Sequence, residues 1–320
     1  MNGLTAIYGE PDEFCDFEAV RRLGETKMTT RLGSSAGELQ AVQVEVTTDE
    51  CGDETGADGM MGGGCIDETD FVRSNLLMGI EDERELGVNS AKFGIIASTD
   101  THTSTPGATD EQSWGGHVSS ESNPAERLAP GLLPSGIHGN PGGLAGVWAV
   151  ENSRDAIFEA LERREVFGTS GPRIEPRFFG AWDYAPGLCD KNDSLEVAYA
   201  LGVPMGGDLG PRPEGASPLF FATARADVKS SAPLQRLQII KGWLDDENRK
   251  HYKVFDVAGT PDNDAGVDLA TGERFGDGHE ELCTVFADPE FDASQPAFYY
   301  LRAVENPSPR WSLIDCLKID

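Results

Sequence analysis

The chain has no apolar run long enough to cross a membrane, no glycine-rich phosphate loop and no dinucleotide-binding fingerprint. These absences argue against a membrane-spanning protein and against nucleotide-dependent redox chemistry. Positive charge is also scarce, because Asp plus Glu total 55 against 26 Lys plus Arg. The net charge of −29 argues against binding to nucleic acid or to anionic membranes, since both are bound through Lys and Arg.

The six cysteines include no C-x-x-C pair, so no zinc site of that type is predicted. One arrangement has a disulfide between Cys51 and Cys65 closing a glycine-rich loop, with Cys283 and Cys316 on segments that could be neighbouring strands. The alternative is six buried thiols in a reducing cell. Residues from Met1 onward lack the basic start and apolar core of a signal peptide, so the chain as written is expected to be soluble and unexported.

The most informative segment is KFGIIASTDTHT, residues 92–103, in which a short apolar run ends in Asp-x-His. Residues 93–97 have the length and branching of a buried strand, and a Pro-Gly pair soon afterwards stops it. Because residues i and i+2 of an extended chain point to the same side, Asp100 and His102 are predicted to project together from the strand's C-terminal end. A carboxylate and an imidazole so placed suit a divalent metal, although an isolated Asp-x-His also occurs in ordinary polar turns.

The spacing of apolar residues before this motif predicts helices over residues 12–23 and 69–86 and a strand over residues 40–47. After it, the long polar stretch over residues 103–142 is interpreted as a lid over the site.

The next pattern predicts a strand over residues 144–149, a helix that begins at Asn152 or Ser153 and ends near Arg164, and a strand over residues 165–169. This strand–helix–strand order is the one that a β/α barrel needs. Farther along the chain, short β-branched or aromatic runs separated by Gly, Pro and Asp predict a compact β-sandwich. The runs are residues 220–224, 234–242, 251–257, 282–287 and 297–304.

Several long blocks of the sequence resemble a known family. They are FGIIASTDTHTSTPG, NPGGLAGVWAVENSRDAIFEALERREVFGTSGPRI, RFFGAWDY, VPMGGDLG, LQRLQIIKGW and AFYYLRAVENPSPRWS. The blocks are similar to the later part of a bacterial domain-of-unknown-function (DUF) family placed with the polymerase-and-histidinol-phosphatase (PHP) metallohydrolases. The resemblance implies a metal-dependent hydrolase on a distorted β/α barrel and does not imply a particular substrate.

The family's usual opening, a His-x-His strand followed by a Thr-Asp-His segment, is absent, and the first histidine is His102. We therefore expect a C-terminal portion of the family's domain, natural or truncated, with an incomplete metal site and an exposed barrel edge. The expected fold is α/β, with residues 1–178 as part of a PHP-like barrel and residues 179–320 as a β-sandwich-like domain. Family members are often larger and exported, so a missing N-terminus would make a periplasmic or extracellular location the alternative.

The candidate metal ligands are Asp100 and His102, which are compatible with zinc, manganese or iron. Arg173 follows a predicted strand, where its guanidinium could hold a phosphate or carboxylate through two hydrogen bonds; a structural salt bridge is the alternative. Ser170 could add a hydroxyl contact. Glu10 resembles an acidic residue of the family and is a candidate ligand or base, or else a solvated surface residue.

Four residues of the polar stretch over residues 103–142 are candidates for contact with substrate, or else surface loop residues. They are Glu111, Trp114, His117 and His138.

Together these residues predict metal-assisted hydrolysis, in which a metal-bound water attacks phosphorus or a carbonyl and Arg173 stabilises the developing negative charge. A small phosphorylated molecule is the expected substrate, on the strength of the resemblance alone. The alternative is a non-catalytic fragment or binding module whose β-rich C-terminal part recognises a partner or carbohydrate through exposed aromatic residues. The aromatic candidates are Trp243, Tyr299, Tyr300 and Trp311.

Overall fold

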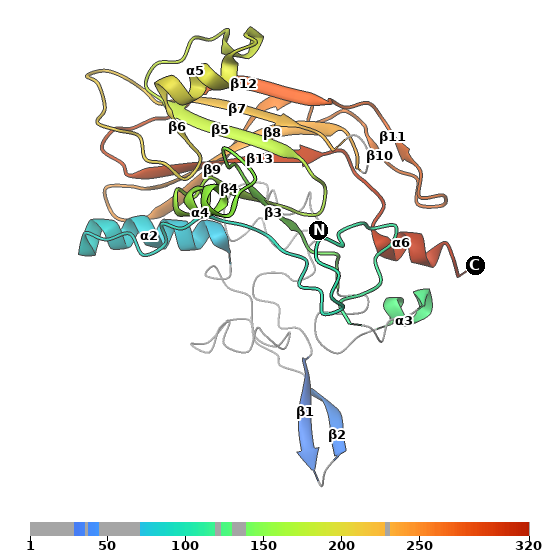
Figure 1. Ribbon diagram of the computed structural model, residues 1–320. Helices are drawn as coiled ribbons and strands as arrows, with labels where there is room; N and C mark the ends of the chain where they lie inside the picture. Colours follow the sequence, from blue (N-terminus) through green and yellow to red (C-terminus); the bar gives the residue numbers. More distant parts are fainter. Residues whose placement is uncertain are drawn as a thin grey trace. The chain divides into compact units, whose positions relative to one another are not determined.

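The computed structural model describes residues 71–118, 123–129, 139–227 and 231–319, together with the strands β1 (Thr29–Ser35) and β2 (Glu38–Val44). The chain divides into two compact units, one made of Met1–Asn75 and Ala129–Gly139 and the other of Leu76–Leu128 and Asn140–Asp320. In the first unit, β1 and β2 form an antiparallel hairpin (Figure 1). The strand predicted over residues 40–47 is thus confirmed in part, and the helix predicted over residues 12–23 lies outside the described residues.

Helix α2 (Val72–Leu86) confirms the helix predicted over residues 69–86. It ends at Gly87, whose φ of 76° lies in the left-handed region that glycine tolerates. Leu77 and Ile80, on the buried face of α2, pack against Leu244 and Phe298.

The strands β3 (Leu144–Val147) and β4 (Val166–Thr169) flank α4 (Arg154–Glu162), as the sequence predicted. The Ser153 side chain caps α4 by accepting a hydrogen bond from the backbone N–H of Ala156. However, β3 and β4 are antiparallel, whereas successive strands of a β/α barrel are parallel. The described strands close no barrel, so the predicted PHP-like barrel is not confirmed.

The prediction of a buried strand over residues 93–97 is wrong. These residues have no regular secondary structure, and the side chains of Phe93 and Ile96 are 50% and 53% exposed. The segment runs alongside β4, because Gly94 lies against Val166 and Ala97 lies against Gly168. Apolar composition alone indicated burial, but this segment does not join the ladder that β3 and β4 form.

The C-terminal region is rich in strands, and all five strands predicted there are confirmed. They are β7 (Leu219–Arg225), β8 (Leu234–Leu244), β9 (Lys250–Gly259), β12 (Glu281–Ala287) and β13 (Ala297–Glu305). Four further strands of this region were not predicted: β5 (Glu175–Ala181), β6 (Val203–Pro204), β10 (Gly266–Val267) and β11 (Arg274–Phe275). The remaining elements are α3 (Pro124–Leu128), η4 (Leu188–Asp190), α5 (Ser194–Leu201) and α6 (Trp311–Cys316).

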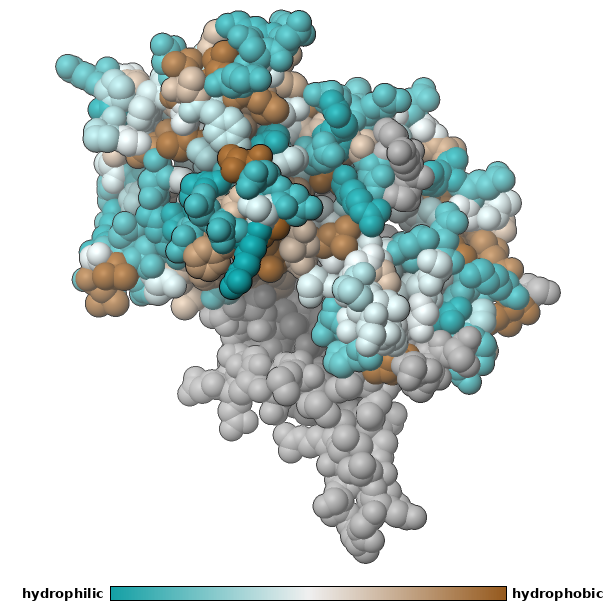
Figure 2. Space-filling model, viewed as in Figure 1, coloured by the Kyte–Doolittle hydropathy of each residue, from teal (hydrophilic) through white to brown (hydrophobic). Residues whose placement is uncertain are grey.

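These strands form two larger antiparallel sheets, ordered β12-β7-β5-β6 and β13-β8-β9 (Figure 1). The sheets share hydrophobic cores, since Ile239 of β8 packs with Phe178, Phe220 and Ala222 of the four-stranded sheet. On the face drawn in Figure 2, hydrophilic side chains cover most of the described surface and hydrophobic ones stand in small groups. The division of the chain at residue 178 stays a prediction.

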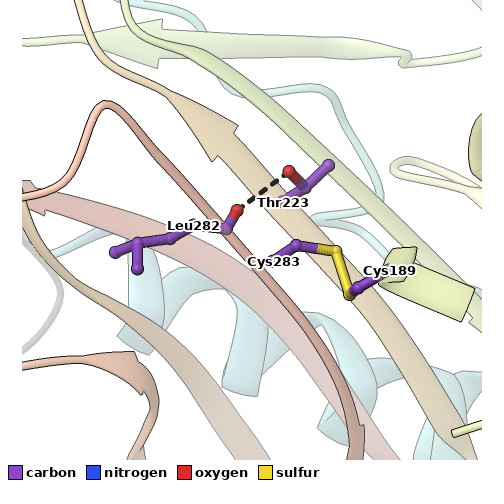
Figure 3. The surroundings of a disulfide bond; sticks show 4 residues. All are labelled: Cys189, Thr223, Leu282 and Cys283. Carbon is purple, nitrogen blue, oxygen red and sulfur yellow. Dashed lines mark hydrogen bonds between the residues drawn. A yellow bond between two sulfur atoms is a disulfide. The ribbon is translucent and has the colours of Figure 1, made fainter. Parts of the chain in front are cut away.

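A disulfide joins Cys189 of η4 to Cys283 of β12 (Figure 3). The suggested proximity of Cys283 and Cys316 is therefore wrong, and Cys316 is a free, exposed thiol. Six reduced thiols are equally excluded, whereas Cys51 and Cys65 lie outside the described residues. Along the parts of the chain that the structure describes, no helix has the length and apolar character needed to cross a membrane.

Candidate functional site

Three segments that are distant in sequence meet beside the predicted Asp-x-His motif. The N–H of Gly143, just before β3, donates to the carbonyl of Ser98 at 2.8 Å. The hydroxyl of Thr109 donates to the carbonyl of Gly171, just after β4, at 3.0 Å. We call residues 98–105, Gly142, Gly143 and residues 169–171 the Asp100 corner.

Glycine at position 142 allows the close approach of two backbones in this corner. Its φ is 71°, and a Cβ there would lie 2.5 Å from the carbonyl oxygen of Ser98 and 2.7 Å from the Cα of Thr99. A side chain would therefore be both strained and obstructed. The Asn-Pro-Gly-Gly segment thus lies directly against the Asp-x-His segment at the start of β3.

The backbone of the motif itself is irregular. Asp100 and Ser104 have φ values of 51° and 57°, in a region that non-glycine residues seldom occupy. The prediction that Asp100 and His102 project to the same side assumed an extended chain. The left-handed conformation of Asp100 does not meet that assumption. Nδ1 of His102 lies 2.9 Å from the carbonyl oxygen of Asp100, and the His102 N–H donates to the carbonyl of His117 at 2.8 Å.

A cluster of hydroxyls lies next to these two residues. The Oγ1 atoms of Thr101 and Thr103 are 2.8 Å apart, those of Thr103 and Thr105 are 2.7 Å apart, and those of Thr101 and Thr105 are 3.2 Å apart. Asp100 and His102 are both exposed. The corner therefore presents a carboxylate, an imidazole and three neighbouring hydroxyls.

The predicted substrate contacts Glu111 and His117 are held within the fold. Oε2 of Glu111 accepts a hydrogen bond from the N–H of Trp311 at 2.7 Å. The side chain of His117 is 8% exposed, and Trp114 meets it edge-on with ring centroids 5.4 Å apart. Nδ1 of His117 is buried without a hydrogen-bond partner among the residues described.

Arg173 and Ser170 follow β4 and are both exposed. The backbone N–H of Arg173 donates to Oδ2 of Asp227 at 2.9 Å. No ion pair of the Arg173 guanidinium occurs within residues 71–118, 123–129, 139–227 and 231–319, so the structural salt bridge considered as its alternative role is not seen there. Glu10 and His138 lie outside the described residues.

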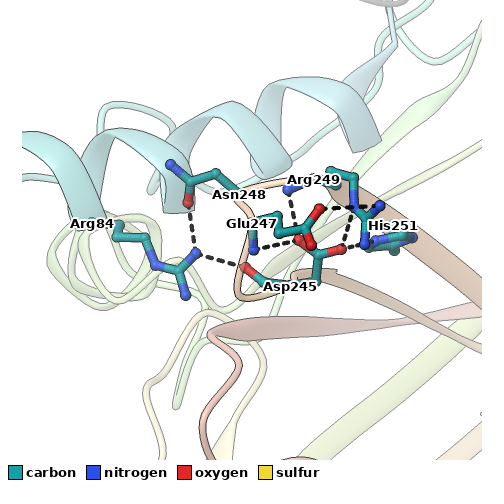
Figure 4. A network of polar contacts seen from close by, with 6 residues as sticks. All are labelled: Arg84, Asp245, Glu247, Asn248, Arg249 and His251. Carbon is teal, nitrogen blue, oxygen red and sulfur yellow. Dashed lines mark hydrogen bonds and ion pairs between the residues drawn. The ribbon is translucent and has the colours of Figure 1, made fainter.

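A second Asp–His pair lies at the β8–β9 turn, far along the sequence from the Asp100 corner. Oδ2 of Asp245 lies 2.9 Å from Nε2 of His251 and accepts a hydrogen bond from Nε of Arg249 at 2.7 Å (Figure 4). The bond with His251 is the largest cause that holds the pKa of the Asp245 carboxyl well below its usual range. Arg84 of α2 donates to the Asp245 carbonyl at 2.8 Å, so this network fastens the turn to the helix.

The residues present fit part of a metal site. Asp and His are suitable ligands, and the orphaned Nδ1 of His117 lies nearby in sequence. However, no group of three or more His, Cys, Asp or Glu side chains is gathered for a metal ion in the part of the chain that is described. Further ligands would have to come from outside it.

Sequence reasoning missed the partner of the loop that follows the motif. Trp311 of α6 is 1% exposed, and its ring centroid lies 4.6 Å from that of Trp114. Arg127 of α3 binds Asp315 of α6 through Nε and Oδ2 at 2.6 Å. Nothing in either local sequence connects segments nearly 200 residues apart, so only the fold reveals these contacts.

The described residues form a fold of mixed helices and antiparallel sheets, with a strand-rich C-terminal region and a polar corner beside β3 and β4. The chain belongs to the family described as Protein of unknown function (DUF3604), which matches residues 50–320. No curated protein and no solved structure matches it. The family match confirms the DUF part of the resemblance and leaves its relation to the PHP hydrolases a proposal.

Proposed function

We propose that this protein is a metal-dependent hydrolase of phosphate esters, with the Asp100 corner as part of its active site. The observation that carries the proposal is the pair of left-handed non-glycine residues, Asp100 and Ser104, on either side of His102. Such conformations cost about 1–3 kcal/mol each and cluster at active sites and ligand-binding loops. The resemblance to PHP metallohydrolases adds the reaction class.

Asp100 and His102 would hold a zinc, manganese or iron ion together with ligands from outside the described residues. Such an ion supplies a water whose pKa is lowered toward neutrality. The carbonyl of His117 fixes the backbone of His102, so the position of the imidazole is restricted. The exposed guanidinium of Arg173 would bind the phosphate oxygens, and Ser170 would add a hydroxyl donor.

The binding-module alternative has less geometric support. It predicted exposed aromatic residues, but Trp311 is 1% exposed and the hydroxyl of Tyr299 donates to Asp288 at 2.7 Å. Trp243 is stacked by His251, with ring centroids 5.2 Å apart. These aromatic rings make contacts within the fold.

Metal content measured by mass spectrometry on protein purified without chelator tests the proposal. We expect stoichiometric metal in the wild type and its loss in Asp100→Ala/His102→Ala. The matched control is Asp245→Ala/His251→Ala, which removes an Asp–His pair elsewhere and should keep the metal. A metal-free wild type after supplementation with zinc, manganese and iron would contradict the proposal.

Hydrolysis of a panel of phosphate monoesters and diesters then tests the reaction. Arg173→Ala should raise KM for an active substrate by about 10- to 100-fold, because a charge-assisted hydrogen bond contributes about 1.5–3 kcal/mol. The exposed Arg225, which lies 3.7 Å from Oε2 of the exposed Glu281, is the control position.

A further inference from the structure

The C-terminal helix α6 holds the loop that follows the Asp-x-His motif. The Trp311 ring lies against Trp114, with ring centroids 4.6 Å apart, and the two side chains are 1% and 7% exposed. Oε2 of Glu111 accepts the Trp311 N–H at 2.7 Å, in the first turn of α6. A buried aromatic contact and a charge-assisted hydrogen bond therefore both hold the start of α6 against this loop.

A buried ion pair forms a second anchor between α6 and this loop region. Nε of Arg127 lies 2.6 Å from Oδ2 of Asp315, and their side chains are 11% and 4% exposed. Lys318 binds the other carboxylate oxygen of Asp315 at 3.1 Å. A pair this well shielded is costly to break, because either partner alone would be left as a buried charge.

The contacts continue from α6 to His102. Trp114 meets the ring of His117 edge-on at 5.4 Å, and His117 is 8% exposed. The carbonyl of His117 accepts the N–H of His102 at 2.8 Å. A continuous series of contacts thus connects the C-terminal helix to the proposed metal ligand. It runs from Trp311 through Trp114 and His117 to His102.

We propose that Trp311 is a positioning residue for His102, which it holds in place through Trp114 and His117. The irregular backbone around His102 lies outside any helix or strand. The ordering of this segment therefore depends on the elements packed against it. The conformational part of this inference stands alone, whereas its consequence for metal binding rests on the proposed function.

Amide hydrogen exchange of protein labelled with ¹⁵N at its five histidines tests the conformational part. Trp311→Leu should speed exchange of the His102 amide at least tenfold. The His279 amide, which donates to the Leu234 carbonyl at 2.8 Å within the strand-rich region, should be unchanged in the same sample. Trp311→Phe should restore slow exchange at His102, because it keeps an aromatic ring against Trp114.

Asp315→Asn is the second variant, in case Trp311→Leu does not fold. It weakens the other anchor of α6 and should also speed exchange at His102 alone. Unchanged His102 exchange in whichever of these variants folds would overturn the inference. Equal acceleration at His279 would also overturn it, since that result would show general destabilisation.

Titration with Mn²⁺ tests the consequence for the metal. Trp311→Leu should weaken Mn²⁺ binding about tenfold, as changes behind a metal ligand commonly do, and Trp311→Phe should restore it. Wild-type protein that binds no Mn²⁺, zinc or iron would refute the proposed function, and the exchange result would then decide the positioning role by itself. Unchanged Mn²⁺ affinity with faster His102 exchange would overturn the metal consequence.

Discussion

The ammonium of Lys241 lies 2.6 Å from Oδ2 of Asp288, and their side chains are 3% and 0% exposed. Lys241 also donates to the carbonyl of Glu290 at 2.8 Å, and the hydroxyl of Tyr299 donates to the same Asp288 oxygen at 2.7 Å. Burial alone would raise the pKa of the Asp288 carboxyl, but the hydrogen bonds from Lys241 and Tyr299 outweigh it, and the pKa is lowered. This group fastens the C-terminal part of β8 to the segment after β12.

Breaking this pair from one side should destabilise the protein strongly. Asp288→Asn leaves the Lys241 ammonium buried without its counter-charge, and we expect the free energy of unfolding to fall by about 3–5 kcal/mol. Lys241→Met should cost a similar amount for the reciprocal reason. Urea unfolding followed by tryptophan fluorescence measures both.

The double variant Lys241→Met/Asp288→Leu is the critical comparison. With no buried charge left, it should be more stable than either single variant. Additive losses in the double variant would contradict the view that the uncompensated charge is the main cost.

Much of the fold was predictable from local pattern. Alternating or β-branched residues predicted five strands from local sequence alone, namely β7, β8, β9, β12 and β13. The start of α4 was predictable because Ser153 is a favourable N-cap residue. The predictions that failed were those that depended on contacts with segments distant in sequence. Residues 93–97 look like a buried strand, but whether a strand forms depends on a partner edge that the local sequence does not encode.

The site illustrates the same limit. The sequence singled out Asp100, His102 and Arg173 through residue type and position. The φ of 51° at Asp100 was not predictable, because residue type and local pattern favour an ordinary extended or helical backbone there. The anchoring by Trp311 was equally hidden, because a tryptophan after a Pro-rich segment does not indicate what it packs against.

The Cys189–Cys283 disulfide should contribute substantially to stability. It closes a loop with a sequence separation of 94 residues, and loss of such a cross-link costs about 2–5 kcal/mol. Cys283→Ser should lower the urea midpoint accordingly, and dithiothreitol should lower the wild type but not the variant. Cys316→Ser, at the free exposed thiol, is the matched control and should be neutral. Wild-type protein indifferent to dithiothreitol would mean that the bond does not form.

Two variants can distinguish the steric role of Gly142 in the Asp100 corner from the ordinary cost of placing a side chain at a positive φ. Gly87 and Gly142 have similar φ values of 76° and 71°, but a Cβ at Gly87 meets nothing within 4 Å whereas one at Gly142 would strike Ser98 and Thr99. Gly87→Ala should cost about 1 kcal/mol from its backbone alone. Gly142→Ala should cost clearly more and, if the proposed function holds, should also reduce metal content. Equal losses in the two variants would show that the contact with Ser98 and Thr99 is unimportant.

Glu305 should make stability fall as pH rises through the near-neutral range. Burial is the main cause that raises its pKa from 4.5 to about 7, with the charge of Asp227 adding to the rise and the hydrogen bond from Ser231 opposing it. Because the folded state holds this proton more tightly than the unfolded state, its stabilising effect is complete below pH 4.5 and is lost as the pH rises through about 7.

Glu305→Gln removes the ionisation while keeping the size of the side chain. Each pKa unit corresponds to about 1.4 kcal/mol, so the variant should be more stable than the wild type by about 3 kcal/mol at pH 8 and should match it near pH 4.5. Thermal unfolding of both proteins from pH 4 to 8 measures the difference in their stability at each pH. Taking this difference removes the effect of titrating groups that the two proteins share. Glu281→Gln, at a side chain that is 55% exposed, is the control and should show no such divergence. A wild type as stable as Glu305→Gln at pH 8 would mean that the carboxylate is better solvated than its buried Oε1 indicates.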